Sequence, residues 1–351
     1  GNMLWNKIIR PVNMYSTTNE AWACWMELRN DKLYVSGNFG LDNDNNSLCY
    51  YLDTLITTKQ VREMPEEERK PPFKESLWTW FAQFDLDGNL LEDHFVEAYS
   101  REIMDIVAPG YRRTLPVCFS IPSPMHVDNE GNTIVFTSLS YSGNEEEDPF
   151  TIVIDGDSSK TYDIYMPGTP PPIQMHHCVM LKFSPDWELI QVKPIIHHTE
   201  GIPIIDGIPM VGIGFEGLSY DEQDNLYLSG LCTFHPYASD FQYPARVYLD
   251  STHHITMHDI SGGKQTPYVM KCDTDGNVQW CQQMYLKGSG GTATQTVIAK
   301  WFASAYNNEA IYMTGVGSYY YGDTTIGIFF DSTHIQQLQA PQGVPGFARN
   351  T

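Results

Sequence analysis

The stretch "YVMKCDTDGNVQW" at residues 268–280 decides the fold, because it contains the parts of a β-hairpin in order. Two segments rich in apolar residues flank a polar Asp-Gly-Asn centre, and Gly and Asn accept the positive φ angles that a tight turn demands. The first five residues of the chain, "GNMLW", match the second half of this hairpin, Gly276 to Trp280. A piece of the same unit therefore stands at the other end of the chain.

Laying the chain on itself reveals four related strands. They read "LYVSG" at 33–37, "IVFTS" at 134–138, "LYLSG" at 226–230 and "IYMTG" at 311–315. Apolar and other residues alternate along them, which is the period-2 signature of a strand, and each ends in a small residue. Another predicted strand precedes each of the four, so each copy begins with a hairpin.

Two further hairpins belong to the repeat. Outer hairpins related to 268–280 begin at residue 80 and residue 179, and a middle hairpin precedes each outer one, as in "CYYLDTLI", "TIVIDGDSS", "RVYLDSTHHI" and "GIFFDSTHI". We place the repeats at about 20–98, 113–197, 213–286 and 296–351 plus 1–12. The fourth copy ends at "GFARNT" without its last strand, and the N-terminal match supplies that strand.

This pattern predicts an all-β fold, a single β-propeller over residues 1–351 with about four enlarged blades. The ring would be closed by pairing of residues about 2–9 beside residues about 345–350, which leaves no open sheet edge. A fifth or further blade hidden in a long insert, or an array of β-sandwiches, is the alternative. No alternation of strands with long amphipathic helices occurs, which argues against a parallel α/β sheet.

The repeat resembles the bacterial β-propeller repeat of the SBBP type, whose pattern pairs D-x-x-G-N-x-Y-V-x-G with F-V-x-K-x-D-x-x-G-N-x-x-W. The matching segments are "DEQDNLYLSG" with "YVMKCDTDGNVQW", "DNEGNTIVFTS" with "VMLKFSPDWEL", and "FAQFDLDGNLL". The copies here are longer than is usual for that family and only four in number. The resemblance implies a secreted, surface-attached or periplasmic bacterial protein whose leader has been removed, and it implies no shared catalytic residues.

The composition narrows the partners. A formal charge of −22 argues against nucleic acid and anionic membrane surfaces, since both need basic patches. No apolar run is long enough to span a membrane, and we expect a monomer. The seven cysteines are scattered, so we expect buried free thiols rather than a disulfide framework.

No metal or cofactor is expected, with calcium the one candidate. "LDNDNNS" at 41–47 places Asp42, Asp44 and Asn46 at the alternate positions that open a calcium loop, but the Gly and distal Glu of an EF-hand are missing. Three adjacent histidine pairs, 176–177, 197–198 and 253–254, are interpreted as surface or structural residues. Neighbouring strand residues point to opposite faces, so one pair cannot chelate an ion.

The sequence favours a non-catalytic binding module for a glycan or a protein. No motif of a known nucleophile, metalloprotease or nucleotide site is present, and Tyr319, Tyr320 and Tyr321 in the loop "SYYYG" are the predicted ligand-binding residues. The alternatives are a glycan-active enzyme using an axial propeller pocket, or a structural or assembly protein. An enzyme would require a concave site with at least two converging titratable groups, which a flat binding face lacks.

Overall fold

The computed structural model describes most of the predicted strands, in two compact units, Gly1–Val192 and Lys193–Thr351. The described residues are 9–11, 21–40, 47–52, 55–60, 77–100, 105–108, 111–113, 118–119, 124–143, 150–155, 157–164, 173–202, 204–205, 208–209, 211–234, 245–257, 265–283, 285–288, 298–307, 310–318, 325–329 and 335–339. Within these ranges the only helical element is the 3-10 turn η1 (Ser158–Lys160), so the all-β prediction is confirmed. No helix in the described part has the length and hydropathy of a membrane span.

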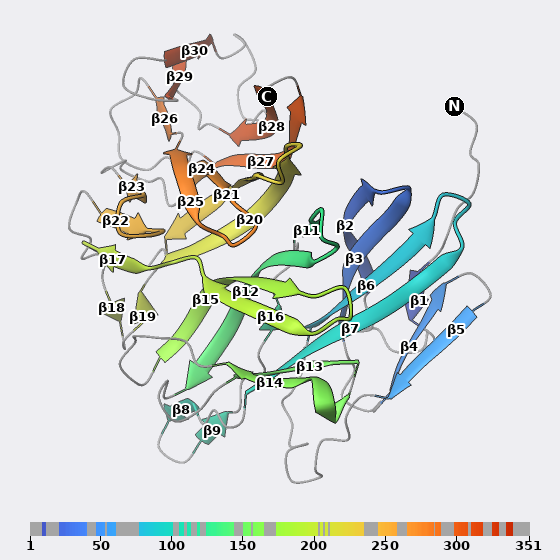
Figure 1. The fold of residues 1–351 in the computed structure, drawn as a ribbon. Helices are drawn as coiled ribbons and strands as arrows, with labels where there is room; N and C mark the ends of the chain where they lie inside the picture. Colours follow the sequence, from blue (N-terminus) through green and yellow to red (C-terminus); the bar gives the residue numbers. More distant parts are fainter. Residues whose placement is uncertain are drawn as a thin grey trace, which may run out of the picture. The chain divides into compact units, whose positions relative to one another are not determined.

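The first repeat forms an antiparallel meander that is extended by a hairpin of the second repeat. The order across the sheet is β14-β13-β7-β6-β3-β2 (Figure 1). The strands are β2 (Ala21–Arg29), β3 (Lys32–Gly40), β6 (Leu77–Asp85), β7 (Leu90–Ser100), β13 (Phe150–Ile154) and β14 (Thr161–Ile164). The second half of β7 pairs with β13, so this sheet draws strands from two repeats.

The second repeat forms the next sheet of the first unit. Its order is β10-β12-β15-β16, and β11 also pairs with β12. The strands are β10 (Cys118–Phe119), β11 (Met125–Val127), β12 (Thr133–Gly143), β15 (Ile173–Phe183) and β16 (Leu189–Pro194). Apolar side chains from both sheets form one buried cluster, which includes Phe81, Ile152, Val135, Leu181 and Phe183. The core of this unit therefore lies between the two sheets.

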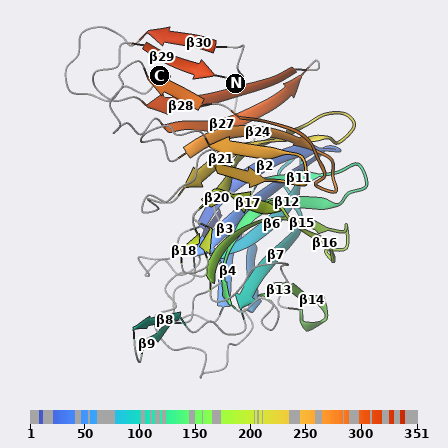
Figure 2. The same ribbon diagram turned by 90° about the vertical axis from the view of Figure 1, so that its left-hand side faces the viewer.

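The third repeat forms a four-stranded antiparallel sheet in the second unit. Its order is β20-β21-β24-β25, with β20 (Val211–Tyr220), β21 (Leu226–Phe234), β24 (Gln265–Cys272) and β25 (Val278–Gln283). From the fourth repeat, β27 (Ile298–Asn307) and β28 (Ala310–Ser318) form a hairpin, and β27 lies against β20 and β21 (Figure 2). All four strand motifs identified in the sequence thus lie in the strands β3, β12, β21 and β28.

The middle hairpin of each repeat pairs with a strand that precedes that repeat in the chain. The pairings are β1 (Ile9–Pro11) with β4 (Ser47–Leu52) and β5 (Leu55–Gln60), β7 with β13 and β14, β17 (His198–Glu200) with β22 (Ala245–Tyr248) and β23 (His254–Met257), and β26 (Tyr285–Gly288) with β29 (Thr325–Phe329) and β30 (Ile335–Gln339). Two short strand pairs complete the described sheets: β8 (Asp105–Ala108) with β9 (Tyr111–Arg113), and β18 (Ile204–Ile205) with β19 (Ile208–Pro209). Consecutive repeats are therefore joined by shared sheets.

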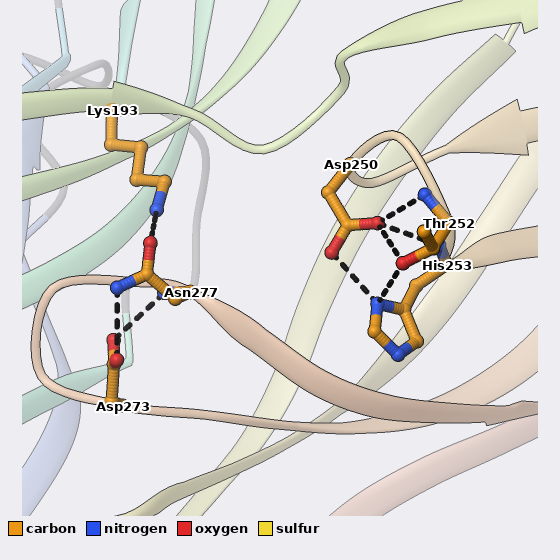
Figure 3. A network of polar contacts seen from close by, with 6 residues as sticks. All are labelled: Lys193, Asp250, Thr252, His253, Asp273 and Asn277. Atoms are coloured by element: carbon orange, nitrogen blue, oxygen red, sulfur yellow. Dashed lines mark hydrogen bonds and ion pairs between the residues drawn. The ribbon is translucent and has the colours of Figure 1, made fainter.

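Five hairpin turns share one backbone pattern. In each, the N–H of the first residue donates to the carbonyl four positions on, and the N–H of the fourth residue donates back to the first; the turns are 85–89, 128–132, 184–188, 221–225 and 273–277. Four of the five begin with Asp and end with Asn, whose side chains hydrogen-bond each other, as Asp273 and Asn277 do in Figure 3. The fourth residue is left-handed, with φ from 56° to 85°.

The described cysteines are free thiols, as predicted. Cys178, Cys232 and Cys272 are buried, and Cys281 is partly buried. Burial raises the pKa of the Cys272 thiol to about 12, and the nearby Asp273 carboxylate adds to this shift, so the thiol stays protonated at neutral pH. The side chains of the other three cysteines are outside the described set.

No closed ring is detected among the described residues. Of the segments predicted to close it, Ile9 is described and pairs with Leu52 of β4, whereas residues 2–8 and 345–350 lie outside the described residues. The antiparallel sheets are thus established, and the propeller and its single domain stay predictions.

Candidate functional site

A pocket with a volume of about 200 Å³ opens in the first unit. It lies on the face of the first sheet that packs against the second sheet, and turn residues of the second sheet complete its wall. Its lining includes Lys32, Tyr34, Phe81, Glu92, His94 and Trp187. We call it the Trp187 pocket.

Strand register gathers the polar residues on this face. Tyr34 of β3 stands opposite Glu27 of β2 and Gln83 of β6, and Gln83 stands opposite Glu92 of β7. Directly opposed residues share a face, so these four side chains form one row across four strands. His94 lies two positions beyond Glu92 and therefore points to the same face.

His94 lies between two carboxylates. Its Nδ1 is 2.7 Å from Oδ2 of Asp155, and its Nε2 is 2.9 Å from Oε1 of Glu92. The Nε2 contact is at ion-pair distance without the alignment of a hydrogen bond, so the exposed Glu92 side chain must turn before a proton can pass between the two groups. A carboxylate, an imidazole and a second carboxylate thus form a chain, in which Glu92 and His94 line the pocket and Asp155 lies behind His94.

Trp187 occupies the left-handed position of the turn between β15 and β16. Its φ is 56°, whereas the same position holds Gly88, Gly131 or Gly276 in three of the other turns. The left-handed conformation costs a residue with a Cβ atom about 1–2 kcal/mol, and bulky residues adopt it rarely. Strained backbone of this kind clusters at functional sites, where the surrounding structure maintains it.

The Trp187 ring is buried against other rings. It stacks on His94 with centroids 4.3 Å apart, and its centroid is 4.9 Å from that of Phe81 and 5.5 Å from that of Phe183. The imidazole is therefore held on one face by an indole and at one nitrogen by a carboxylate.

The surroundings of Tyr34 keep its phenol group protonated. Burial raises the pKa of Tyr34, and the negative charges of Glu27 and Glu92 raise it further. Asp93 points to the opposite face of β7, where burial raises the pKa of its carboxyl. The pocket therefore offers a phenol that can both donate and accept hydrogen bonds.

None of the residues predicted from the sequence is among the described residues that line the Trp187 pocket. Tyr319, Tyr320 and Tyr321, and the calcium-loop candidates Asp42, Asp44 and Asn46, all fall outside the described residues. His176 and His177 lie on β15, and His197 and His198 lie in the second unit, where His198 stacks on Tyr248 with centroids 4.0 Å apart. No cluster of three or more His, Cys, Asp or Glu side chains that could hold a metal is found in the described part.

The third histidine pair includes a residue with a structural role. Asp250 accepts hydrogen bonds from the backbone and side chain of His253 and from Thr252 (Figure 3). Burial alone would raise the pKa of this carboxyl, and the bonds from His253 and Thr252 outweigh burial and hold the pKa far below its usual value.

Sequence reasoning missed Glu92, His94, Asp155 and Trp187. The signal available was Trp187 itself, because "SPDWE" places an indole where the parallel "DTDGN" has glycine. A turn residue that departs from its repeat toward a strained alternative identifies a position with a second role.

Comparisons with known proteins give distant structural neighbours alone. No protein-family model and no curated protein sequence matches the chain. Two solved structures that match are those of the GH43_1 enzyme from Xanthomonas citri, one of them complexed with xylotriose. Each has 11% identity and a TM-score of 0.26 over 88% of this chain, and they are covered over 84% and 85% of their own lengths. A likeness this remote transfers no residue role.

The prediction of a non-catalytic binding module is corrected. The neighbours found are GH43_1 enzymes, which agree with the alternative of a glycan-active enzyme rather than with the main prediction. The pocket itself meets the requirement set for an enzyme, since Glu92 and His94 converge in a concave site.

Proposed function

We propose that the protein is an enzyme that acts on glycans, with the Trp187 pocket as its active site. The observation that carries this proposal is the chain Glu92–His94–Asp155 at the wall of a concave pocket. Titratable side chains that converge in a concave pocket are the usual mark of acid–base chemistry.

The lining suits a sugar ring. Sugars present apolar C–H faces and hydroxyl edges, and the pocket combines aromatic walls with hydrogen-bonding groups on Tyr34, Gln83 and Lys32. Its volume of about 200 Å³ is below the roughly 300–1,000 Å³ of sites for drug-sized ligands. This favours recognition of a single ring or chain end.

Glu92 is the group placed to transfer a proton. In glycoside hydrolysis a water oxygen bonds to the anomeric carbon, the bond to the leaving oxygen breaks, and that oxygen takes up a proton. Glu92 lines the pocket, so its carboxyl can donate to the leaving oxygen or accept from the water. His94, with Asp155 behind it, exchanges protons with Glu92 and stabilises the charge that forms.

The test is hydrolysis of a panel of 4-nitrophenyl glycosides and oligosaccharides, xylotriose among them. With the best substrate, Glu92→Gln should lower kcat/KM by about 10²–10⁴-fold, because it removes the proton-transfer group and keeps the shape. Glu188→Gln, on the exposed turn beside Trp187, is the matched control and should leave the rate unchanged. Cleavage of no member of the panel, or equal rates in the two variants, would refute the proposal.

We also propose that the repeats are blades of a closed propeller, with residues 1–8 as the outer strand of the fourth blade. Supporting this, β7, β17 and β26 each continue or follow an outer strand and pair with the middle hairpin of the next repeat. β1 pairs with the middle hairpin of the first repeat in the same way. On this proposal the residues just before β1 are the outer strand. The match of "GNMLW" to 276–280 aligns β1 with β26. Kinship with SBBP-type repeats, a location outside the cytoplasm and a monomeric state stay predictions.

Deleting residues 1–8 tests ring closure. Loss of an outer strand should unpair a sheet edge and expose apolar surface, so we expect a melting temperature lower by several degrees or self-association in light scattering. An unchanged melting curve and a monodisperse truncated protein would contradict closure.

A further inference from the structure

Two residues of the second repeat touch His94, and both depart from their counterparts in the third repeat. Asp155 binds its Nδ1, and Trp187 stacks on its ring. Both have a φ of 56°, and they are two of the five non-glycine residues with positive φ in the described ranges. Left-handed backbone at both contacts of one imidazole indicates that these two positions have a role beyond their own turns.

Trp187 stands at the turn position that Gly276 holds in the third repeat. The turns 184–188 and 273–277 have the same backbone hydrogen bonds, at 2.8–2.9 Å and 2.9–3.1 Å. In the second of these, Asp273 and Asn277 close the turn and Lys193 donates to Oδ1 of Asn277 at 2.6 Å (Figure 3). The turn thus forms with glycine at the left-handed position, and the indole is not needed to build it.

Asp155 follows β13, and its counterpart Asp250 follows the corresponding strand β22 of the third repeat. The Asp250 carboxylate is used inside its own turn, at 2.7 Å from the Thr252 nitrogen and 2.6 Å from the His253 nitrogen (Figure 3). In the second repeat that role passes to Asp157, which accepts from the Ser159 nitrogen at 2.8 Å. The Asp155 carboxylate reaches His94 of the preceding repeat instead.

We infer that Asp155 and Trp187 are positioning residues that fix the tautomer and the plane of the His94 ring. An ionised carboxylate only accepts, so Asp155 holds the proton on Nδ1 and directs Nε2 toward Glu92. The indole face prevents the ring from turning out of this plane. The inference rests on the proposed function for its consequence in catalysis, while the state of the ring can be measured independently.

The experiment records the imidazole 15N resonances of His94, assigned by comparison with His94→Gln. The parent protein should show one fixed Nδ1–H tautomer near pH 8. Asp155→Asn should change the tautomer, because the amide can donate to Nδ1, and Trp187→Leu should give averaged, exchanging signals. The matched controls are Asp250→Asn, which alters the corresponding turn of the third repeat, and Trp280→Leu, which removes an exposed indole. Both should leave the His94 signals unchanged.

Activity gives the second readout. With the best glycan, Asp155→Asn and Trp187→Leu should lower kcat by roughly 10²-fold, with KM changed little, because a misplaced proton-transfer chain affects the reaction more than binding. Asp155→Glu should restore part of the rate. Should Trp187→Leu fail to fold, Trp187→Phe, which keeps a stacking ring, is used and should retain the tautomer with broader signals.

The outcomes separate the two proposals. A changed His94 signal in a protein that cleaves no glycan would support the positioning role and refute the proposed function. The inference would be overturned, whatever the activity, if the His94 signals of Asp155→Asn were the same as those of the parent. The same holds if the signals of Trp187→Leu, or of Trp187→Phe where it replaces that variant, equal those of the parent. A parent without a fixed Nδ1–H tautomer would overturn it as well.

Discussion

Gly230→Ala should destabilise the third-repeat sheet by about 4–5 kcal/mol or more, a loss large enough to unfold many domains. A Cβ at this position would lie 1.9 Å from the carbonyl oxygen of Gly214 and 2.9 Å from the hydroxyl of Tyr268. Tyr268 is fully buried and donates to that same carbonyl at 3.1 Å. The methyl group therefore collides with the backbone and with a buried hydrogen bond at once, and neither can move without shifting the strand.

The neighbouring glycine provides the control. A Cβ on Gly214 would meet nothing closer than the Leu231 carbonyl oxygen at 3.8 Å, an ordinary contact. Gly214→Ala should therefore change the free energy of unfolding by no more than about 1 kcal/mol. Urea titration followed by tryptophan fluorescence measures both variants. Midpoints that fall by the same amount in the two variants would show that the close approach at Gly230 does not exist in solution.

The close approach at Gly230 gives a physical reason for the small residue that ends the repeated strand motifs. Each of the motifs at 33–37, 226–230 and 311–315 ends in Gly, and in each hairpin a β-bulge lies opposite that end, at 23–25, 215–217 and 301–303. A bulge brings the partner backbone out of register, and in the third repeat it leaves no room for a side chain. In the second repeat two short strands, β10 and β11, replace the bulged strand, and Ser138 stands in place of Gly.

Strand positions and turns could be predicted because each depends on a short stretch of sequence. Strands show alternating apolar residues, and turns show the sequence Asp-x-x-Gly-Asn. Pairing of β13 with β7 could not, because the sequence shows a hairpin without showing which sheet receives it. That non-local pairing brings Asp155 to His94. The site could therefore not be predicted from the sequence either. The prediction looked for function in variable loops, whereas the described site is built on paired strands and one altered turn.

The second large effect is expected at the buried pair Glu27 and His126, which joins the two sheets of the first unit. The side chains of Glu27 and His126 are 5% and 0% exposed, and Oε1 of Glu27 is 3.1 Å from Nδ1 of His126. Oε2 of Glu27 also accepts from the Val127 nitrogen at 3.3 Å. One carboxylate on β2 thus serves an imidazole and a backbone group on β11.

Glu27→Ala should cost about 3–5 kcal/mol, because it withdraws an acceptor from two buried donors and leaves a cavity between the sheets. The comparison is Glu200→Ala, which breaks a pair with Arg246 at 3.1 Å whose side chains are 49% and 36% exposed. Solvent screens that pair, so its loss should cost no more than about 1 kcal/mol. A double-mutant cycle with His126→Ala then isolates the coupling between Glu27 and His126 from the loss of packing.

Glu27 also belongs to the polar row on the first sheet, where it stands opposite Tyr34. The pKa of Tyr34 is raised by burial first and then by the charges of Glu27 and Glu92. Removing Glu27 withdraws one of these causes, so the Tyr34 phenol should ionise at a lower pH in Glu27→Ala than in the parent. Comparison of ultraviolet pH titrations with those of Tyr34→Phe isolates this group. A loss of stability equal to that of Glu200→Ala, together with an unmoved Tyr34 titration, would show that Glu27 is solvated rather than buried between the sheets.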